Sequence, residues 1–190
     1  PAASLGDVLL AGAAPLLLGE IIVAICGLRW STLRLAGLLA AGLCLKILMV
    51  KVEVDLSLLI GWSIGIAAWA ALMATHRVDR RTAILIYVLL ALGIAALEPF
   101  EVASTPNKLH LLPFTSLLEG SLLTNLQTLG KKIFLFAGLL WIMLPRVLRI
   151  MPVAVVVAAL AFMLELLQTL LAGRVAAVDE PLLIIALGLL

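Results

Sequence analysis

The stretch FMLELLQTLLAGR, residues 162–174, is an apolar helix that nevertheless carries a carboxylate and an amide three residues apart. Residues at i and i+3 share one helix face, so Glu165 and Gln168 are expected to point the same way. Gly173 is expected to end this helix. The short polar loop that follows adds Arg174 and Asp179. We therefore expect the rest of the chain to act as a frame that holds this group of polar side chains.

The overall composition is that of an integral membrane protein. Of 190 residues, 65% are hydrophobic and 13% are charged, and the mean hydropathy is +1.28, whereas soluble domains are about half apolar and about a quarter charged. A membrane-spanning helix needs about 20 apolar residues. Runs of this kind lie at about 8–28, 33–50, 55–74, 82–97, 132–148, 152–171 and from 181 onward. We therefore predict an all-α, polytopic transmembrane helix bundle with about seven spans.

Basic residues are concentrated in alternate loops between the predicted spans. The loops after the first, third and fifth spans contain one acid, Asp79, and the arginines Arg29, Arg34, Arg77, Arg80, Arg81, Arg146 and Arg149. The positive-inside rule assigns these loops to the cytoplasm. The loop at residues 173–180 and the long connection at residues 98–132 are then expected outside.

The long outer connection contains a segment with an amphipathic pattern. Residues 114–129 place most of their leucines near one helical face and their polar side chains elsewhere. This favours a helix that lies in the outer interface, or a re-entrant segment. A lid that only covers the bundle is the simpler alternative.

Three ionisable side chains fall within predicted spans, where such groups usually face the bundle interior or water. Glu20 lies about midway along the first span, Lys46 toward the outer end of the second, and Glu165 two-thirds of the way along the sixth. Lys46 and Glu165 have matching depths of about 20 Å, so the two side chains are candidates for an ion pair. Arg174 is the preferred partner of Glu165, because arginine binds carboxylates in a bidentate manner and is near in sequence.

Two interpretations of Glu165 and Gln168 remain open. The pair either forms an interhelical hydrogen bond that only fixes packing, or joins Arg174 and Asp179 in a polar pocket that opens outward and binds a ligand. Candidate supporting residues are Lys46, Glu20 and His110. A structural contact explains Glu20 as well as a site does, and a histidine such as His110 is more often an interfacial side chain than a ligand.

The sequence carries no signature of a metal, a cofactor or a nucleic acid. No His/Cys cluster has the spacing of a metal site, and there is no phosphate-binding loop, nucleophile elbow or metalloprotease pair. We expect neither a metal nor a cofactor. The basic residues only flank predicted spans, so nucleic-acid binding is not indicated.

Several short motifs follow one another in the second half of the chain. They are LLPF at 111–114, KIFLFAGLL at 132–140, ELLQ at 165–168, Gly173-Arg174, and Asp179-Glu180. In this order and spacing they resemble the VanZ-like family, whose hallmark is Glu-x-x-Gln, then Gly-Arg, then an acidic pair; Ile185 stands near the place of a family Asn. We therefore predict a four-span region at 1–97 and a VanZ-like domain at 98–190. Because the chain starts at Pro1 and stops within an apolar run, we expect further residues at both ends.

The resemblance implies a bacterial cell-envelope protein of the cytoplasmic membrane, since the family is named for a protein that gives low-level resistance to the lipoglycopeptide teicoplanin. Our first hypothesis is a protein that contributes to envelope modification or glycopeptide antibiotic resistance. It would bind membrane lipids, a lipid-linked envelope precursor or a lipoglycopeptide at the outer leaflet, with Arg174 binding a phosphate or carboxylate. One alternative is a membrane-embedded enzyme acting on a lipid-linked substrate, with Glu165 as general base. Another is an accessory or scaffold subunit of a membrane assembly. Oligomerisation, a partner subunit and catalysis are left open.

Overall fold

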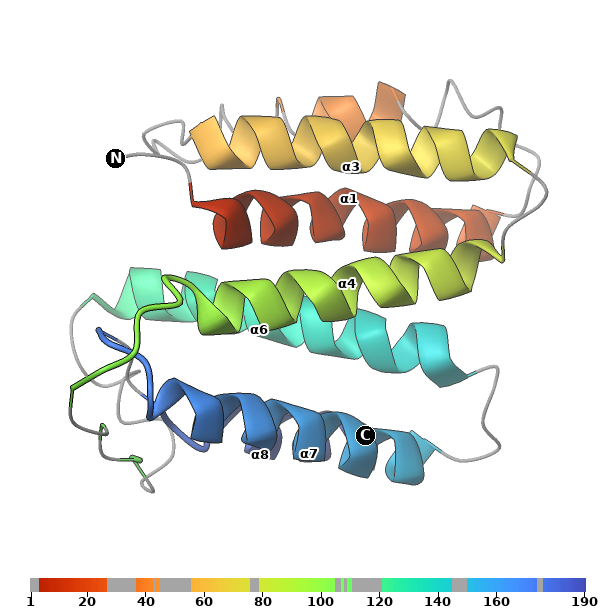
Figure 1. The fold of residues 1–190 in the computed structure, drawn as a ribbon. Helices are drawn as coiled ribbons and strands as arrows, with labels where there is room; N and C mark the ends of the chain where they lie inside the picture. Colours follow the sequence, from red (N-terminus) through yellow and green to blue (C-terminus); the bar gives the residue numbers. More distant parts are fainter. Residues whose placement is uncertain are drawn as a thin grey trace. The chain divides into compact units, whose positions relative to one another are not determined.

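The computed structural model describes residues 4–26, 37–42, 44, 56–75, 79–104, 107, 109–110, 121–144, 150–173 and 176–190. The described chain is built from helices, as predicted (Figure 1). These are α1 (Leu5–Cys26), α3 (Leu56–Ala74), α4 (Arg80–Leu97), α6 (Leu122–Met143), α7 (Ile150–Gln168) and α8 (Asp179–Leu189). Contacts divide the chain into two compact units, Pro1–Ala95 and Ala96–Leu190.

Five of the described helices are long and apolar enough to cross a membrane. They are Leu5–Ile25, Leu56–Ala74, Arg80–Leu97, Thr124–Met143 and Ile150–Gln168. The chain is therefore a membrane protein with at least these candidate spans. Of the predicted second span, only residues 37–42 and 44 are described, and they are helical. Helix α8 has 11 residues, so the predicted total of seven spans is not confirmed.

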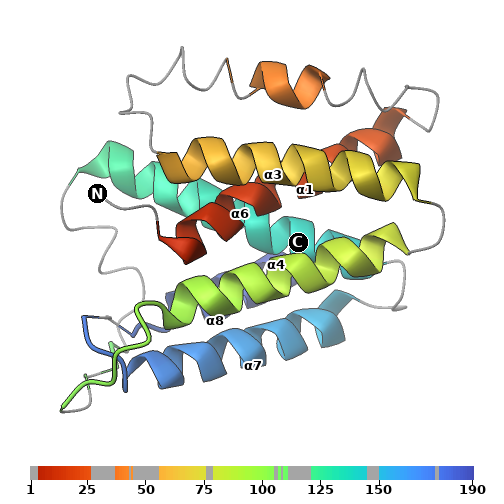
Figure 2. The same ribbon diagram turned by 45° about the horizontal axis from the view of Figure 1, so that its top comes forward.

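In the first unit, α1 and α3 lie side by side and run in the same direction (Figures 1 and 2). A methyl group at Gly61 would overlap the Val8 carbonyl oxygen, and one at Gly65 would overlap the Gly12 carbonyl oxygen. Gly61 and Gly65 form a GxxxG pair, which lets backbones approach closely in a membrane, where no hydrophobic force joins helices. The absence of side chains at these two positions therefore sets the α1–α3 contact.

The described residues 37–42 are tied to the same pair of helices. The Trp62 indole N–H donates a hydrogen bond to the Leu39 carbonyl oxygen, with the two atoms 3.2 Å apart. Both side chains are buried. This contact anchors the only described helical stretch of the predicted second span against α3.

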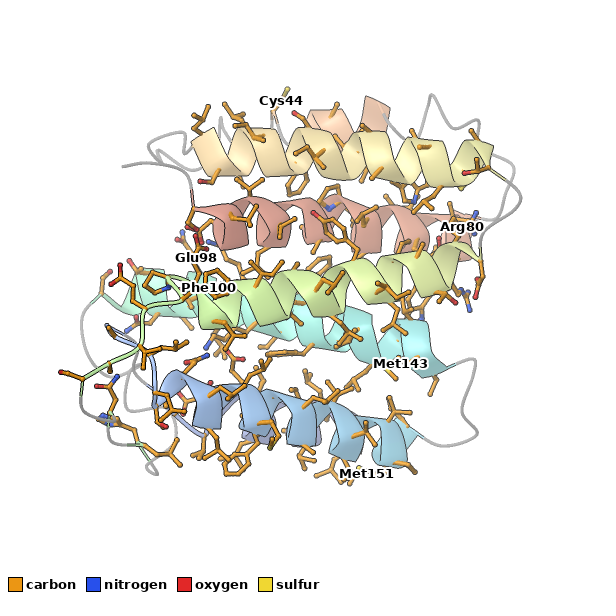
Figure 3. All side chains as sticks on the ribbon, viewed as in Figure 1. Cys44, Arg80, Glu98, Phe100, Met143 and Met151 are labelled. Carbon is orange, nitrogen blue, oxygen red and sulfur yellow. The ribbon has the colours of Figure 1, made fainter. Side chains whose placement is uncertain are left out.

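The start of α4 is defined by its capping residue. The Asp79 carboxylate accepts a hydrogen bond from the Arg81 amide at 3.3 Å and from the Thr82 hydroxyl at 2.6 Å. An acidic residue at this position satisfies amide groups that the helix itself leaves unpaired. Figure 3 shows Arg80 at this end of α4 and Glu98 at the other.

In the second unit, α8 packs along α7 in the opposite direction. A methyl group at Gly188, near the end of α8, would overlap the side chain of Ala154, near the start of α7. Met143 ends α6 and Met151 is the second residue of α7, and the two lie at the same end of this unit (Figure 3). Successive helices of the unit therefore alternate in direction.

The predicted fifth span is wrong in its boundaries. The prediction was a span that begins at residue 132, but α6 begins at Leu122, so Lys131 and Lys132 lie in its interior. Residues 122–129, predicted to belong to a separate interfacial or re-entrant segment, form the first turns of the same helix. The rest of that segment, 114–120, lies outside the described residues.

The sequence explains why α6 continues through the two lysines. Its weakest helix former before them is Gly130, which costs only about 1 kcal/mol relative to Ala, and Leu126, Leu129 and Ile133 continue one apolar face. About ten residues, or roughly 15 Å, precede Lys132 in the helix. The first half of α6 is largely exposed, with Leu126 at 55%. The first half of α6 is therefore a more polar extension of the helix. In the sequence, its two lysines resemble the residues that mark a membrane interface.

Candidate functional site

The carboxylate of Glu165 lies buried in the last turn of α7. Its residue is only 5% exposed, and Oε2 accepts a hydrogen bond from the Ala177 amide at 2.9 Å. A buried carboxylate is costly in a membrane helix unless it has such partners. The chain supplies this partner by folding back over the end of α7, so the site depends on how α7 ends.

Helix α7 ends at Gln168, five residues before the glycine that was predicted to end it. The amides of Thr169, Leu170 and Leu171 each bond to the carbonyl three residues earlier, which tightens the last turn. The Thr169 hydroxyl also donates to the Leu166 carbonyl at 2.6 Å. Gly173 has a φ of +71°, so it serves the turn that follows the helix and not the helix end itself.

A second segment of the chain pairs with the turn after α7. The Ala103 amide donates to the Leu170 carbonyl, and the Ala172 amide donates to the Glu101 carbonyl. Asn107 contributes two bonds, from its amide to the Thr169 carbonyl and from Nδ2 to the Leu171 carbonyl, each 2.7 Å long. These bonds satisfy carbonyl groups that the end of α7 leaves unpaired.

The pairing continues to the residues that hold Glu165. The His110 amide donates to the Ala176 carbonyl at 2.9 Å, and the Val178 amide donates to the His110 carbonyl at 3.3 Å. Ala177, between these two anchors, is the residue that bonds to Glu165. The segment Ala176–Val178 is thus held from one side by the backbone of His110 and from the other by the Glu165 side chain.

Charged side chains from two other helices lie next to Glu165. Lys132 of α6 forms an ion pair with Glu180 of α8, with Nζ and Oε1 3.0 Å apart. Lys132, Asp179 and Glu180 are all close enough to act electrostatically on the Glu165 carboxylate. Asp179 and Glu180 occupy the first turn of α8, where the helix dipole favours negative charge. We call Glu165, Lys132, Asp179 and Glu180 the Glu165 cluster.

The cluster combines a buried group with reachable ones. The Lys132 and Glu180 side chains are 37% and 28% exposed, whereas Glu165 is buried. Such an arrangement offers an ammonium and a carboxylate to a polar molecule and holds a third charge in a fixed position. It presents hydrogen-bonding and electrostatic contacts, which suit binding.

The predicted site residues fare differently. Glu165 and Asp179 belong to one cluster, and Gln168 is the partly buried last residue of α7. His110 has an exposed side chain and takes part through its backbone. Arg174 and Lys46 lie outside the described residues, so neither predicted partner of Glu165 is tested.

Glu20 belongs to a separate ion-paired group in the first unit. Its buried carboxylate accepts hydrogen bonds from Arg80 Nε at 2.7 Å and from Arg81 Nε at 3.4 Å. The prediction placed Glu20 midway along its span, but it lies six residues before the end of α1. That position brings it level with the start of α4, so the structural interpretation of Glu20 accounts for its burial.

Sequence reasoning missed Lys132, Ala177, Arg80 and Arg81 as partners. The sequence could have suggested Lys132 as a partner, since Lys132 and Glu165 were both assigned to the outer side of the membrane. The sequence could also have suggested Arg80 and Arg81 as partners of Glu20, because the first span ends and the fourth begins on the same side of the membrane. Ala177 acts through its backbone amide, which no side-chain pattern reveals.

Among the residues that the structure describes, no group of three His, Cys, Asp or Glu side chains could hold a metal ion. Comparison of the chain with protein-family models, with curated proteins and with solved structures finds no match. The functional conclusion therefore depends on the Glu165 cluster and its surroundings.

Proposed function

We propose that this chain is a multi-pass membrane protein that binds the polar head of an amphiphile at the Glu165 cluster. The observation that carries the proposal is the pairing of a buried, fixed carboxylate with a partly exposed Lys132–Glu180 ion pair. Ionisable groups in membrane helices usually mark a site or a pathway. A phosphate or carboxylate of the ligand would bind Lys132, and its hydroxyl or amine donors would bind Glu180.

A purely structural role explains Glu165 less completely. An interhelical hydrogen bond that only fixes packing needs one donor and one acceptor. Here three further charges act electrostatically on the carboxylate, and two of them are partly exposed and lie on different helices. Exposed ion pairs contribute little to stability, which leaves recognition as the better use of Lys132 and Glu180.

The membrane arrangement that accompanies this proposal has seven spans. Helices α1 and α3 run in the same direction, so a chain crossing the membrane with both must cross back between them, which supports the span predicted at 33–50. Helix α8 would supply the seventh. By the positive-inside rule the end of α4 that carries Arg80 and Arg81 faces the cytoplasm. The Glu165 cluster then lies toward the outer leaflet.

The ligand class follows from the resemblance to the VanZ-like family. It favours a bacterial cytoplasmic membrane and an outer-leaflet ligand such as a lipid-linked envelope precursor or a lipoglycopeptide. The motif residues Glu165 and Asp179 both belong to the cluster, which supports using the resemblance in this way. Arg174, the third charged residue of the motif, is then a further candidate for contact with an anionic head group.

Two assays on Arg174→Ala test this function in cells and in the purified protein. The variant is expected to insert and fold normally, to lose a lipid that co-purifies with the wild type, and to lose any protection that the wild type gives against a lipoglycopeptide. Lys108→Ala, which removes a basic residue of the 98–132 connection, is the matched control and should behave as wild type. Wild-type behaviour of Arg174→Ala in both assays would reject Arg174 as a head-group contact, and wild-type behaviour of Lys132→Ala in the same assays would reject the proposal.

A further inference from the structure

The segment Ala176–Val178 connects a charge at the end of a membrane helix to a loop distant in sequence. Each of its three residues makes a backbone hydrogen bond to a group outside the segment, and the Val178 carbonyl also accepts one from the Leu182 amide of α8. Ala176 and Val178 bond to the backbone of His110, and Ala177 bonds to the carboxylate of Glu165. Any change that weakens the bond at Ala177 therefore acts on a segment that is also anchored to the loop.

The loop in question is residues 98–110, which follow α4, and its described part is bonded to the turn after α7 and to Ala176–Val178. Isolated bridges join Val102 to Leu171 and His110 to Ala177. Asn107 adds its two bonds to the turn after α7. Apart from Glu165, the contacts named here between the loop, the turn and Ala176–Val178 are made by backbone atoms or by the neutral Asn107 side chain. Glu165 is thus the anchor whose strength changes with charge.

A hydrogen bond from an amide to an ionised carboxylate is roughly twice as strong as one between neutral groups. Protonation of Glu165 leaves the oxygen in place but removes this charge assistance. From these contacts we propose that Glu165 is a protonation-controlled latch, which holds the loop 98–110 and the segment Ala176–Val178 together over the end of α7. The latch is fastened while Glu165 is ionised and loosens once Glu165 takes up a proton.

The charges that face Glu165 would set when the latch opens. They are Lys132 on α6 and Asp179 and Glu180 on α8. His110 on the loop bonds to Ala176 and Val178 through its backbone atoms. Arg174 lies outside the described residues. Loss of the Lys132–Glu180 pair would therefore change the pH at which the latch opens.

Hydrogen–deuterium exchange on the purified full chain in detergent, with no ligand added, tests the latch. Exchange of peptides covering 176–178 and 109–110 is compared at neutral and acidic pH after correction for intrinsic rates. In the wild type, protection of these peptides should fall about fivefold on acidification, because the bond from the Ala177 amide loses its charge assistance. Unchanged protection in the wild type would overturn the proposal without any variant.

Two substitutions identify the group responsible. Glu165→Gln should give low protection at both pH values and no pH dependence, because its amide oxygen accepts only a neutral bond. His110→Gln should keep the wild-type pH dependence, since the backbone atoms of residue 110 remain. Exchange in the buried second half of α6 should match the wild type in both variants, which reports that the second unit is intact. A pH dependence that survives in Glu165→Gln, or disappears in His110→Gln, would contradict the latch.

Discussion

The Ala177 amide donates a hydrogen bond to the Glu165 carboxylate twelve residues earlier, with N and Oε2 2.9 Å apart. This contact closes the chain over the end of α7 and gives a buried charge a partner. It also brings Glu165 beside Lys132, Asp179 and Glu180. The stability of the second unit and the proposed function both depend on it.

Glu165→Ala should destabilise the protein by about 1–3 kcal/mol, because the Ala177 amide is left without its acceptor. Denaturant unfolding in detergent micelles measures the change. Glu101→Ala is the matched control in the same unit, since the Glu101 side chain is exposed and its carbonyl makes the contact with Ala172. It should change stability by less than about 0.5 kcal/mol. Equal effects of the two substitutions would contradict the assigned contact.

Glu20→Ala should lower stability by about 1–3 kcal/mol, because Arg80 and Arg81 lose the carboxylate that they share. The loss is kept below the full cost of breaking a buried pair because the two arginines are partly exposed. Asp7→Asn, an acid in the exposed first turn of α1, is the control. Thermal unfolding followed by circular dichroism separates the two, and a wild-type midpoint for Glu20→Ala would refute the ion-paired group.

Gly61→Ala should destabilise the α1–α3 contact by about 1–3 kcal/mol, since a methyl group there meets the Val8 carbonyl oxygen. Gly93→Ala in α4 meets no atom within 4 Å. It should be neutral or stabilising by up to about 1 kcal/mol, because alanine is the better helix former. The same denaturant titration measures both. A tolerated Gly61→Ala would show that the two backbones do not approach as closely as described.

The orientation in the membrane is tested by labelling single cysteines in a chain from which Cys26 and Cys44 have been removed. Ser104→Cys, in the loop after α4, should react with an impermeant maleimide added outside intact cells. Thr75→Cys, after α3, should react only once the membrane is permeabilised. Both positions are exposed, so access depends on the side of the membrane. The reverse pattern would invert the topology derived from the arginines.

The helical membrane fold could be predicted because length and hydropathy alone decide which segments cross a bilayer. Helices α1, α3, α4 and α7 lie within a few residues of their predicted spans. Helix α6 does not, because Lys131 and Lys132 look like an interface and only the extent of the helix shows that they are interior. Charged side chains mark an interface reliably only when the helix stops there.

The Glu165 cluster could be predicted in part. A carboxylate in an apolar helix is visible in any sequence, so Glu165 was found, and Asp179 followed from its nearness. Lys132 is 33 residues away and becomes a neighbour only through the packing of α6 against α8. The Ala177 amide depends on the backbone path after α7. Contacts set by packing and by backbone conformation leave no pattern in side-chain identity.

The most direct test of the central claim is the occupancy of bound lipid on the purified chain, measured by native mass spectrometry for Lys132→Ala and Lys131→Ala. The two lysines are adjacent on α6, but Lys132 belongs to the Glu165 cluster and Lys131 is exposed. Binding of a polar head at the cluster predicts that Lys132→Ala loses most of the co-purifying lipid while Lys131→Ala retains it. Equal occupancy in the two variants and the wild type would contradict the account.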